Sequence, residues 1–257
     1  MSPITVTSLA IAPVKAMRLR QVQEIELDEQ GAAGDRRFYV VDERGRMVNG
    51  KQFAQLQTIV PDYDAETSRL TLTFPNGEAV SGQVEPGEAV TARFYRRTDE
   101  IPELRGPFSE AVSAHVGHSL RIVAAASGVD RGHAGATSLI SRASLRRLAE
   151  AAGQDSIDPR RFRMLIEIDG VAAHEEDGWI DRRVRAGEAL VRMRGHVGRC
   201  LITSRDPDSA RGDLPTLDLL RSYRSDVGTT EPLPFGVYGE VLEGGRVRVA
   251  DPVALDG

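Results

Sequence analysis

The chain has 257 residues, of which 40% are hydrophobic and 28% charged, and its formal net charge is -5. This length can bury one large β-rich core or two smaller ones, and the composition is ordinary for a soluble globular protein. The acidic balance excludes a general attraction to nucleic acid or to anionic membranes, so any basic cluster in this chain needs a local reason.

Signals for export or membrane insertion are not visible in the sequence. No apolar run approaches the roughly 18 residues that a membrane span requires. The segment from Met1 to Pro13 lacks the basic region and long apolar stretch of a secretory signal. With a single cysteine and no signal, the sequence predicts a cytoplasmic protein without a membrane or nucleic-acid partner.

Apolar and β-branched stretches alternate with turn residues through the first hundred positions. Turn chemistry is found at Asp42 to Gly45, Pro61-Asp62, Pro75 to Gly77 and Pro86-Gly87. Short strands at this spacing predict a barrel or a sandwich. We expect strands over residues 4–11, 22–27, 38–41, 57–60, 69–74, 79–83 and 90–94.

The rest of the chain mixes three helices with further strands. Pro107 and Gly117 bracket the first expected helix, Gly153 ends the second, and Thr216 could cap the third. These helices are expected over residues 108–116, 141–152 and 217–223, with a polar loop over 127–135. Strands are expected over 120–123, 163–168, 189–193, 200–203 and 236–242.

Cys200 is the only cysteine of the chain. One thiol can form neither an internal disulfide nor a multi-cysteine metal site, but it can act as a nucleophile or as the single protein ligand of a metal that brings its other ligands along. Arg199 precedes it and would favour the reactive thiolate. The alternative is a buried structural cysteine that packs as a small apolar residue.

Basic residues near expected strand ends or turns are the second feature that could carry chemistry. Taken singly, each is typical of a solvated surface. Taken together in an acidic protein, they could converge on an anion such as a phosphate, which suits arginine and lysine geometry. They are Lys15, Arg36, Arg37 and Lys51 in the first half and Arg160, Arg161, Arg163 and Arg199 in the second.

An ordered series of motifs resembles the MOSC family, from residue 3 to about 240. The runs Ala12 to Lys15 and Gly34 to Phe38 are similar to the N-terminal β-barrel that precedes MOSC domains. The MOSC domain itself is suggested by Arg161-Phe162-Arg163, Glu175 to Trp179, Gly187-Glu188, Arg199-Cys200, Asp206-Pro207-Asp208 and Leu217 to Arg224.

The resemblance implies a mostly β fold with a few helices, in which a MOSC-type β-barrel follows a smaller N-terminal β-barrel-like domain. The charged run from Arg96 to Glu100 marks the only candidate boundary, near residues 95–107. We therefore expect an N-terminal domain over residues 1–100 and a MOSC domain over residues 101–257, packed together as one unit.

The family includes amidoxime-reducing components and the C-terminal domains of molybdenum cofactor sulfurases. The resemblance implies that Cys200 is the catalytic residue and the molybdenum ligand, because one soft thiolate completes a metal already held by a dithiolene and oxo groups. The anionic phosphate of the pterin explains the basic cluster. The implied cofactor contacts are Lys15, Arg36, Lys51, Arg163 and Arg199.

The expected activity is reduction of N-hydroxylated or similar small substrates at molybdenum. Electrons would come from a separate donor protein, because one cysteine cannot hold an iron–sulfur cluster. Two rivals remain: a sulfur carrier or transferase that uses a persulfide on Cys200, and a non-catalytic carrier of the cofactor. Pyridoxal phosphate is not expected, because no lysine is a candidate for its Schiff base. Lys15 and Lys51 are the only lysines, and both are better suited to binding the phosphate.

Several positions depart from the family pattern around the cofactor. Met164-Leu165 replaces a Pro-Asn pair, and Ala16 replaces a serine or cysteine. Lys51 stands where an arginine is common and cannot bind in a bidentate manner. His196, four residues before Cys200, is interpreted as structural or supporting, because His and Cys alone fall short of the three or four ligands of a zinc site.

Overall fold

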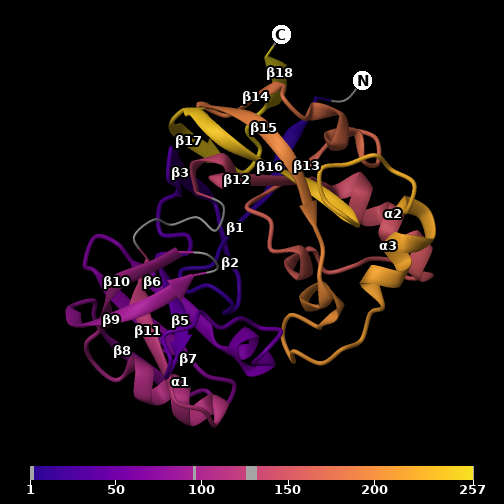
Figure 1. Cartoon of the computed structure of the whole chain (residues 1–257). Helices are drawn as coiled ribbons and strands as arrows, with labels where there is room; N and C mark the ends of the chain where they lie inside the picture. The colour runs from indigo at the N-terminus through magenta and orange to yellow at the C-terminus, as the bar shows by residue number, and fades with distance from the viewer. Residues whose placement is uncertain (1–2, 95–96, 126–131, 257) are drawn as a thin grey trace.

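The computed structural model describes residues 3–94, 97–125 and 132–256. The chain forms two lobes, one coloured indigo to magenta and the other mainly orange to yellow, with both termini at the top of the second (Figure 1). Strands dominate, and the described residues include three α-helices. The predicted fold class, mostly β with a few helices, is therefore confirmed.

An eight-stranded sheet forms the centre of the C-terminal lobe. Its order is β18-β14-β15-β16-β12-β13-β1-β2. All neighbours are antiparallel except β12 and β13, which run parallel. The strands are β1 (Thr5–Ile11), β2 (Arg20–Val22), β12 (Thr137–Ser141), β13 (Ile166–Asp169), β14 (Arg183–Ala186), β15 (Ala189–Gly198), β16 (Pro234–Glu243) and β18 (Val253–Asp256).

Backbone hydrogen bonds join β1 to the segment that leads into β18. Thr5 forms a bridge with Pro252, Val6 N donates to the carbonyl of Asp251 at 2.9 Å, and Val253 N donates to the carbonyl of Ile4 at 2.9 Å. The sheet therefore curls round until its two sides meet. A small sheet of β17 (Gly245–Arg248), β3 (Glu24–Asp28) and β4 (Gly31–Ala32) lies beside it.

The N-terminal lobe contains two sheets. One has the order β5-β11-β10-β9 and the other β6-β7-β8. Apolar and polar residues alternate along β7, so that Leu70 and Leu72 point inward and are fully buried. The strands are β5 (Phe38–Asp42), β6 (Val60–Asp64), β7 (Arg69–Thr73), β8 (Ala79–Gln83), β9 (Pro86–Phe94), β10 (Arg97–Leu104) and β11 (Leu120–Ala124).

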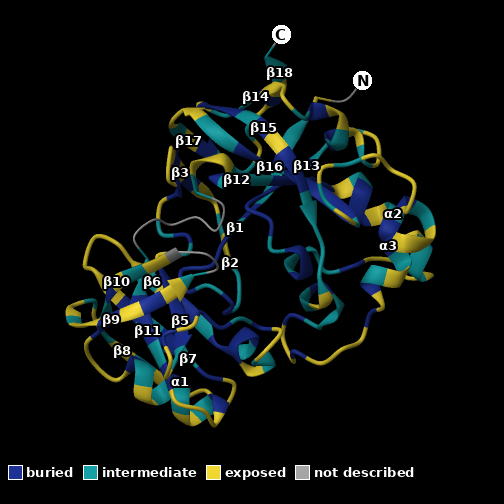
Figure 2. Ribbon diagram, in the orientation of Figure 1, coloured by how far each residue is buried: buried dark blue, intermediate teal, exposed yellow. Residues whose placement is uncertain are grey.

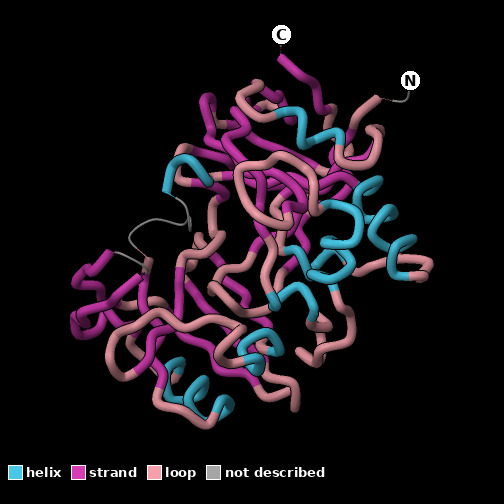
Figure 3. The backbone as a smooth tube through the Cα atoms, turned by 45° about the vertical axis from the view of Figure 1, so that its right-hand side comes forward, coloured by secondary structure: helices cyan, strands magenta, loops and turns pink. Residues whose placement is uncertain are grey.

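The three helices lie on the outer sides of the lobes (Figure 3). They are α1 (Phe108–Val116), α2 (Arg142–Ala152) and α3 (Thr216–Arg224), so all three predicted helices are confirmed. Ser141 caps α2 by accepting a hydrogen bond from Ser144 N, and Gly153 ends it with a φ of 63°. The predicted cap Thr216 is wrong, because this residue is the first of α3 and its hydroxyl donates to the carbonyl of Thr203 at 2.8 Å.

Each lobe has its own apolar core of buried side chains (Figure 2). In the N-terminal lobe, Leu70 and Leu72 pack in one cluster with Phe108 and Ile122. Side chains on both sides of position 100 therefore share a core, while the division into residues 1–100 and 101–257 stays a prediction. Trp179 is 2% exposed and packs in the core of the C-terminal lobe.

Two predicted strands are wrong, because tertiary contacts override local β preference. Gln57 and Thr58 belong to a 3₁₀ turn, η1 (Ala54–Thr58), and β6 begins only at Val60. The 200–203 stretch forms a second 3₁₀ turn, η5 (Leu201–Ser204). This turn brings Ile202 against Gly50 of the other lobe, where an added Cβ would lie 2.4 Å from the Ile202 side chain.

Other differences concern element ends. The strand predicted from residue 163 begins at Ile166, because Arg163 adopts a left-handed conformation. Pro61 and Pro86 lie inside the edge strands β6 and β9, where proline is tolerated, and not in turns. Residues 127–131 of the predicted polar loop and 95–96 of the predicted boundary region lie outside the described residues. Residues 132–135 form the 3₁₀ turn η2 (Gly132–Gly135).

Candidate functional site

A cavity of about 310 Å³ lies between the two lobes. We call it the central cavity. All six predicted site residues line it: Lys15, Arg36, Lys51, Arg163, Arg199 and Cys200. Its volume is at the lower end of the roughly 300–1,000 Å³ typical of small-molecule sites. The structure thus brings these residues together, while their roles stay predictions.

The turn after β1 and the connection into β5 supply the first wall. Lys15 N donates to the carbonyl of Phe38 at 2.8 Å, and Arg36 N donates to the carbonyl of Ala12 at 2.8 Å. Ala16 and Arg36 have positive φ values of 75° and 47°. Non-glycine residues in this region are strained and often mark a functional site, where surrounding contacts hold them.

Asp35 organises this wall. Its carboxylate accepts a hydrogen bond from Ala12 N at 2.7 Å and forms an ion pair with the guanidinium of Arg36. The residue is only 5% exposed. Arg36 also donates through Nη2 to the carbonyl of Arg163 at 3.3 Å, which joins the two lobes at the cavity lining.

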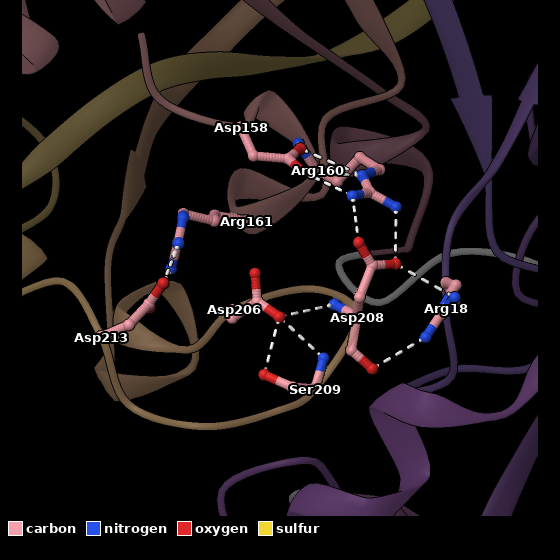
Figure 4. A network of polar contacts seen from close by, with 8 residues as sticks. All are labelled: Arg18, Asp158, Arg160, Arg161, Asp206, Asp208, Ser209 and Asp213. Atoms are coloured by element: carbon pink, nitrogen blue, oxygen red, sulfur yellow. Dashed lines mark hydrogen bonds and ion pairs between the residues drawn. The ribbon is translucent and has the colours of Figure 1, made fainter. Parts of the chain in front are cut away.

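The second wall begins at the 3₁₀ turn η3 (Pro159–Phe162). Asp158 caps this turn by accepting a hydrogen bond from Arg160 N at 2.9 Å. Arg163 follows with a φ of 54° and reverses the chain toward β13. Arg161 is 8% exposed and forms a bidentate pair with Asp213, with N–O distances of 2.7 and 2.6 Å (Figure 4).

Cys200 lies between the end of β15 and η5 and is half-buried. The guanidinium of the preceding Arg199 donates to the carbonyls of Phe162 and Phe235, at 2.7 and 2.8 Å. The same guanidinium also contacts the Met164 sulfur at 3.0 Å. Arg199 therefore supports the wall on which Cys200 stands, in addition to lining the cavity.

The lining of the cavity is strongly basic for a protein of net charge -5. Asp35 is the one acidic residue among its described lining residues. The basic lining residues are Lys15, Arg36, Lys51, Arg161, Arg163 and Arg199. Because arginine and lysine are well suited to phosphate, this balance favours an anionic ligand over a cationic one.

Other polar lining residues were not picked out from the sequence. Asn49 accepts a hydrogen bond from Lys51 N at 2.9 Å, and Tyr238 reaches the cavity from β16. Thr137 is 2% exposed, and its hydroxyl has no hydrogen-bond partner among the described residues. Of these, only Tyr238 lay in an expected element, the strand over residues 236–242.

The remaining candidates lie away from the cavity lining. Arg37 is exposed, and Arg160 pairs with Asp158 and Asp208. His196 is 5% exposed, its Nδ1 is 3.2 Å from the Thr230 hydroxyl, and burial lowers its pKa. Within the described part of the chain, no three or more His, Cys, Asp or Glu side chains are grouped to hold a metal ion. The structural or supporting role of His196 stays a prediction.

Two family models match the chain in tandem. The MOSC N-terminal beta barrel domain matches residues 3–105, and the MOSC domain matches residues 126–254. The chain belongs to the MOSC family.

Curated relatives of this MOSC protein share moderate identity over most of its length. Mitochondrial amidoxime-reducing component 1 of Xenopus laevis is 27% identical over 96% of this chain and 81% of its own length. The mouse (Mus musculus) protein of the same name is 25% identical over 98% of this chain and 82% of its own length.

Among solved structures, the YUAD protein of Bacillus subtilis is 12% identical. It covers 98% of this chain and 94% of its own, with a TM-score of 0.45. In the described part of the MOSC protein, no helix has the length and apolar character needed to cross a membrane.

Proposed function

We propose that the central cavity binds the molybdenum cofactor, with Cys200 as its protein ligand. The observation that carries this proposal is the meeting of the only thiol of the chain with six basic side chains in one cavity. The donor set fits the group, because a single soft thiolate suits molybdenum and the basic side chains suit the pterin phosphate. The unpartnered hydroxyl of Thr137 offers a further polar contact.

The basic residues that line the cavity would have different roles. Lys15, Lys51 and Arg163 would bind the phosphate and pterin, and Arg36 would do so while it holds the carbonyl of Arg163. Arg199 would act mainly by fixing the wall around Cys200 through the carbonyls of Phe162 and Phe235. When bound, the cofactor would supply two-electron chemistry at the metal.

The expected activity is the reduction of N-hydroxylated or similar small substrates. The similarity to proteins named amidoxime-reducing components supports this substrate class. Electrons would come from a separate donor protein, because the single cysteine cannot hold an iron–sulfur cluster. The cytoplasmic location expected from the sequence stays a prediction.

The test is metal and pterin analysis of the full chain made in a host that synthesises the cofactor, beside Cys200→Ala. The expected result is one molybdenum and one pterin per wild-type chain and loss of molybdenum in the variant. Pterin without molybdenum in the wild type would overturn Cys200 as the ligand. No pterin at all, with a persulfide on Cys200, would favour the sulfur carrier.

A turnover measurement distinguishes an oxidoreductase from a non-catalytic carrier of the cofactor. The loaded protein is given a chemical reductant and a small N-hydroxylated amidine, and the amidine product is measured. Product formation in the wild type and not in Cys200→Ala supports the oxidoreductase. Stoichiometric cofactor without any turnover would support the non-catalytic carrier.

A further inference from the structure

Asp208 is contacted by arginines from both lobes (Figure 4). Arg18 Nη1 lies 3.0 Å from Asp208 Oδ1, and Arg18 Nη2 donates to the Asp208 carbonyl at 2.8 Å. Arg160 donates to both carboxylate oxygens, at 3.0 Å from Nη1 and 2.8 Å from Nη2. One carboxylate thus joins two cationic side chains from distant parts of the sequence.

Each partner is itself held in place. Arg18 N donates to the carbonyl of Ile59 at 3.0 Å, which fixes Arg18 to the N-terminal lobe. Arg160 Nε and Nη2 bind Asp158 at 2.9 and 2.6 Å. Asp206 Oδ1 accepts hydrogen bonds from Asp208 N at 3.2 Å and from Ser209 N at 2.7 Å, which shapes the loop that presents the carboxylate.

The three partners continue directly from segments that line the central cavity. Arg18 follows the Lys15-Ala16 turn, Arg160 precedes the 161–165 stretch, and Asp208 follows the segment that contains Cys200. The loop of Asp208 therefore connects the cysteine wall to the opposite wall. The sequence indicated Asp206-Pro207-Asp208 as part of the family resemblance.

Isolated surface ion pairs contribute little to stability, typically about 0–1 kcal/mol. This group differs because Arg160 binds the carboxylate in a bidentate manner and Arg18 shares the same oxygen. The hydrogen bonds from Arg160 hold the pKa of Asp208 below its usual range, so the carboxylate stays ionised at neutral pH. Without that charge, Arg160 would keep its ion pair with Asp158, and Arg18 would lose its ion pair with Asp208.

We propose that Asp208 is a positioning residue that fastens the loop after Cys200 to the N-terminal lobe and thereby slows the release of the ligand from the central cavity. The identity of that ligand rests on the proposed function. Asp208 lines neither wall, so it acts through the residues that do.

The variant to make is Asp208→Asn, which removes the charge and keeps the shape. Asp169→Asn is the matched control, because Asp169 also binds one arginine in a bidentate manner, at 3.0 and 3.3 Å from Arg146, but within the C-terminal lobe. Asp208→Glu tests rescue by a carboxylate. Because Asp208 is 53% exposed, all three chains are expected to fold, which the thermal midpoint checks.

The first measurement is amide hydrogen exchange of full-length protein made without the cofactor. We expect Asp208→Asn to exchange faster at residues 14–18 and at residues 201–209, with Asp169→Asn and Asp208→Glu like the wild type. Faster exchange in the 201–209 segment alone would overturn the link between the lobes. This comparison needs no bound ligand, so it stands apart from the proposed function.

The second measurement is the rate of pterin loss from loaded protein, followed by fluorescence of the oxidised pterin. Asp208→Asn should lose pterin about tenfold faster than the wild type. Raising the salt from about 0.05 to about 0.5 M should speed the loss from the wild type more than from the variant, because salt screens the ion pairs. Equal rates in wild type and Asp208→Asn would overturn the proposal, whereas a wild type without pterin would overturn the proposed function.

Discussion

Arg36 donates a hydrogen bond through Nη2 to the backbone carbonyl of Arg163, 3.3 Å away, and both arginines have positive φ. Each therefore adopts a conformation that costs about 1–3 kcal/mol for a non-glycine residue. Both residues line the central cavity, and the contact connects the two lobes there. Because the backbones of both hydrogen-bonded residues are strained, the geometry favours a site that is shaped for binding over one that is shaped for maximal stability.

Replacing Arg36 by methionine should weaken pterin binding about 10- to 100-fold, because a charged hydrogen-bond donor contributes about 1.5–3 kcal/mol. Arg37→Met is the matched control, since Arg37 is the exposed neighbour outside the cavity lining. The measurement is pterin content after dialysis. Equal pterin loss in both variants would argue against a specific contact at Arg36.

Replacing Arg199 by lysine should lower the free energy of unfolding by about 2–4 kcal/mol. A lysine cannot satisfy the carbonyls of Phe162 and Phe235 together, as the guanidinium does at 2.7 and 2.8 Å. Urea unfolding of the cofactor-free protein measures this cost. Arg194→Lys, a more exposed change on the preceding strand β15, should leave stability within about 0.5 kcal/mol of the wild type.

Stability should fall between pH 6.5 and pH 4 in part because of His174. Burial, the largest cause, lowers the pKa of this imidazole from 6.5 to about 4. In that window the unfolded chain binds the proton and the folded chain does not, so acid favours unfolding. Partial exposure reduces the contribution to about 1–2 kcal/mol.

The variant His174→Asn tests this contribution, because asparagine tolerates the left-handed backbone at that position, where φ is 63°. Urea unfolding at intervals from pH 7 to pH 4 should show a shallower loss of stability in the variant than in the wild type. Parallel curves would show that His174 does not titrate on unfolding.

Gly236→Ala should destabilise the protein by about 2–4 kcal/mol. Gly236 has a φ of 84°, and an added Cβ would lie 2.9 Å from the Leu139 carbonyl oxygen and 2.8 Å from the Met164 side chain. Thermal unfolding measures the effect. Gly228→Ala is the control and should change little, since nothing lies within 4 Å of its added Cβ.

Local signals sufficed for the helices. Pro107 and Gly117 bracket α1, which runs from Phe108 to Val116 as predicted, because capping and backbone preferences act over a few residues. Turn residues on either side likewise set off the strand expected over residues 69–74, and β7 covers Arg69–Thr73.

Features that depend on contacts across the lobes could not be predicted in the same way. The β-type residues from Cys200 to Thr203 form a 3₁₀ turn, since Ile202 packs against Gly50 in the other lobe. The family resemblance identified Cys200 and five basic residues as site candidates. Nothing in the local sequence indicates that Thr137 and Asn49 belong to the site. Their place in the cavity follows only from how the two lobes meet.

The bonds between residues 4–6 and residues 250–253 also constrain the order in which the protein can fold. Pairs so distant in sequence form slowly, because a very long loop must close first. During synthesis, β1 leaves the ribosome early but cannot complete its pairing until residues 250–253 have been made. The N-terminal lobe, which lies between them, can fold first. The central cavity, which residues of both lobes line, therefore forms late, so a ligand should bind only after residues 250–253 have been made.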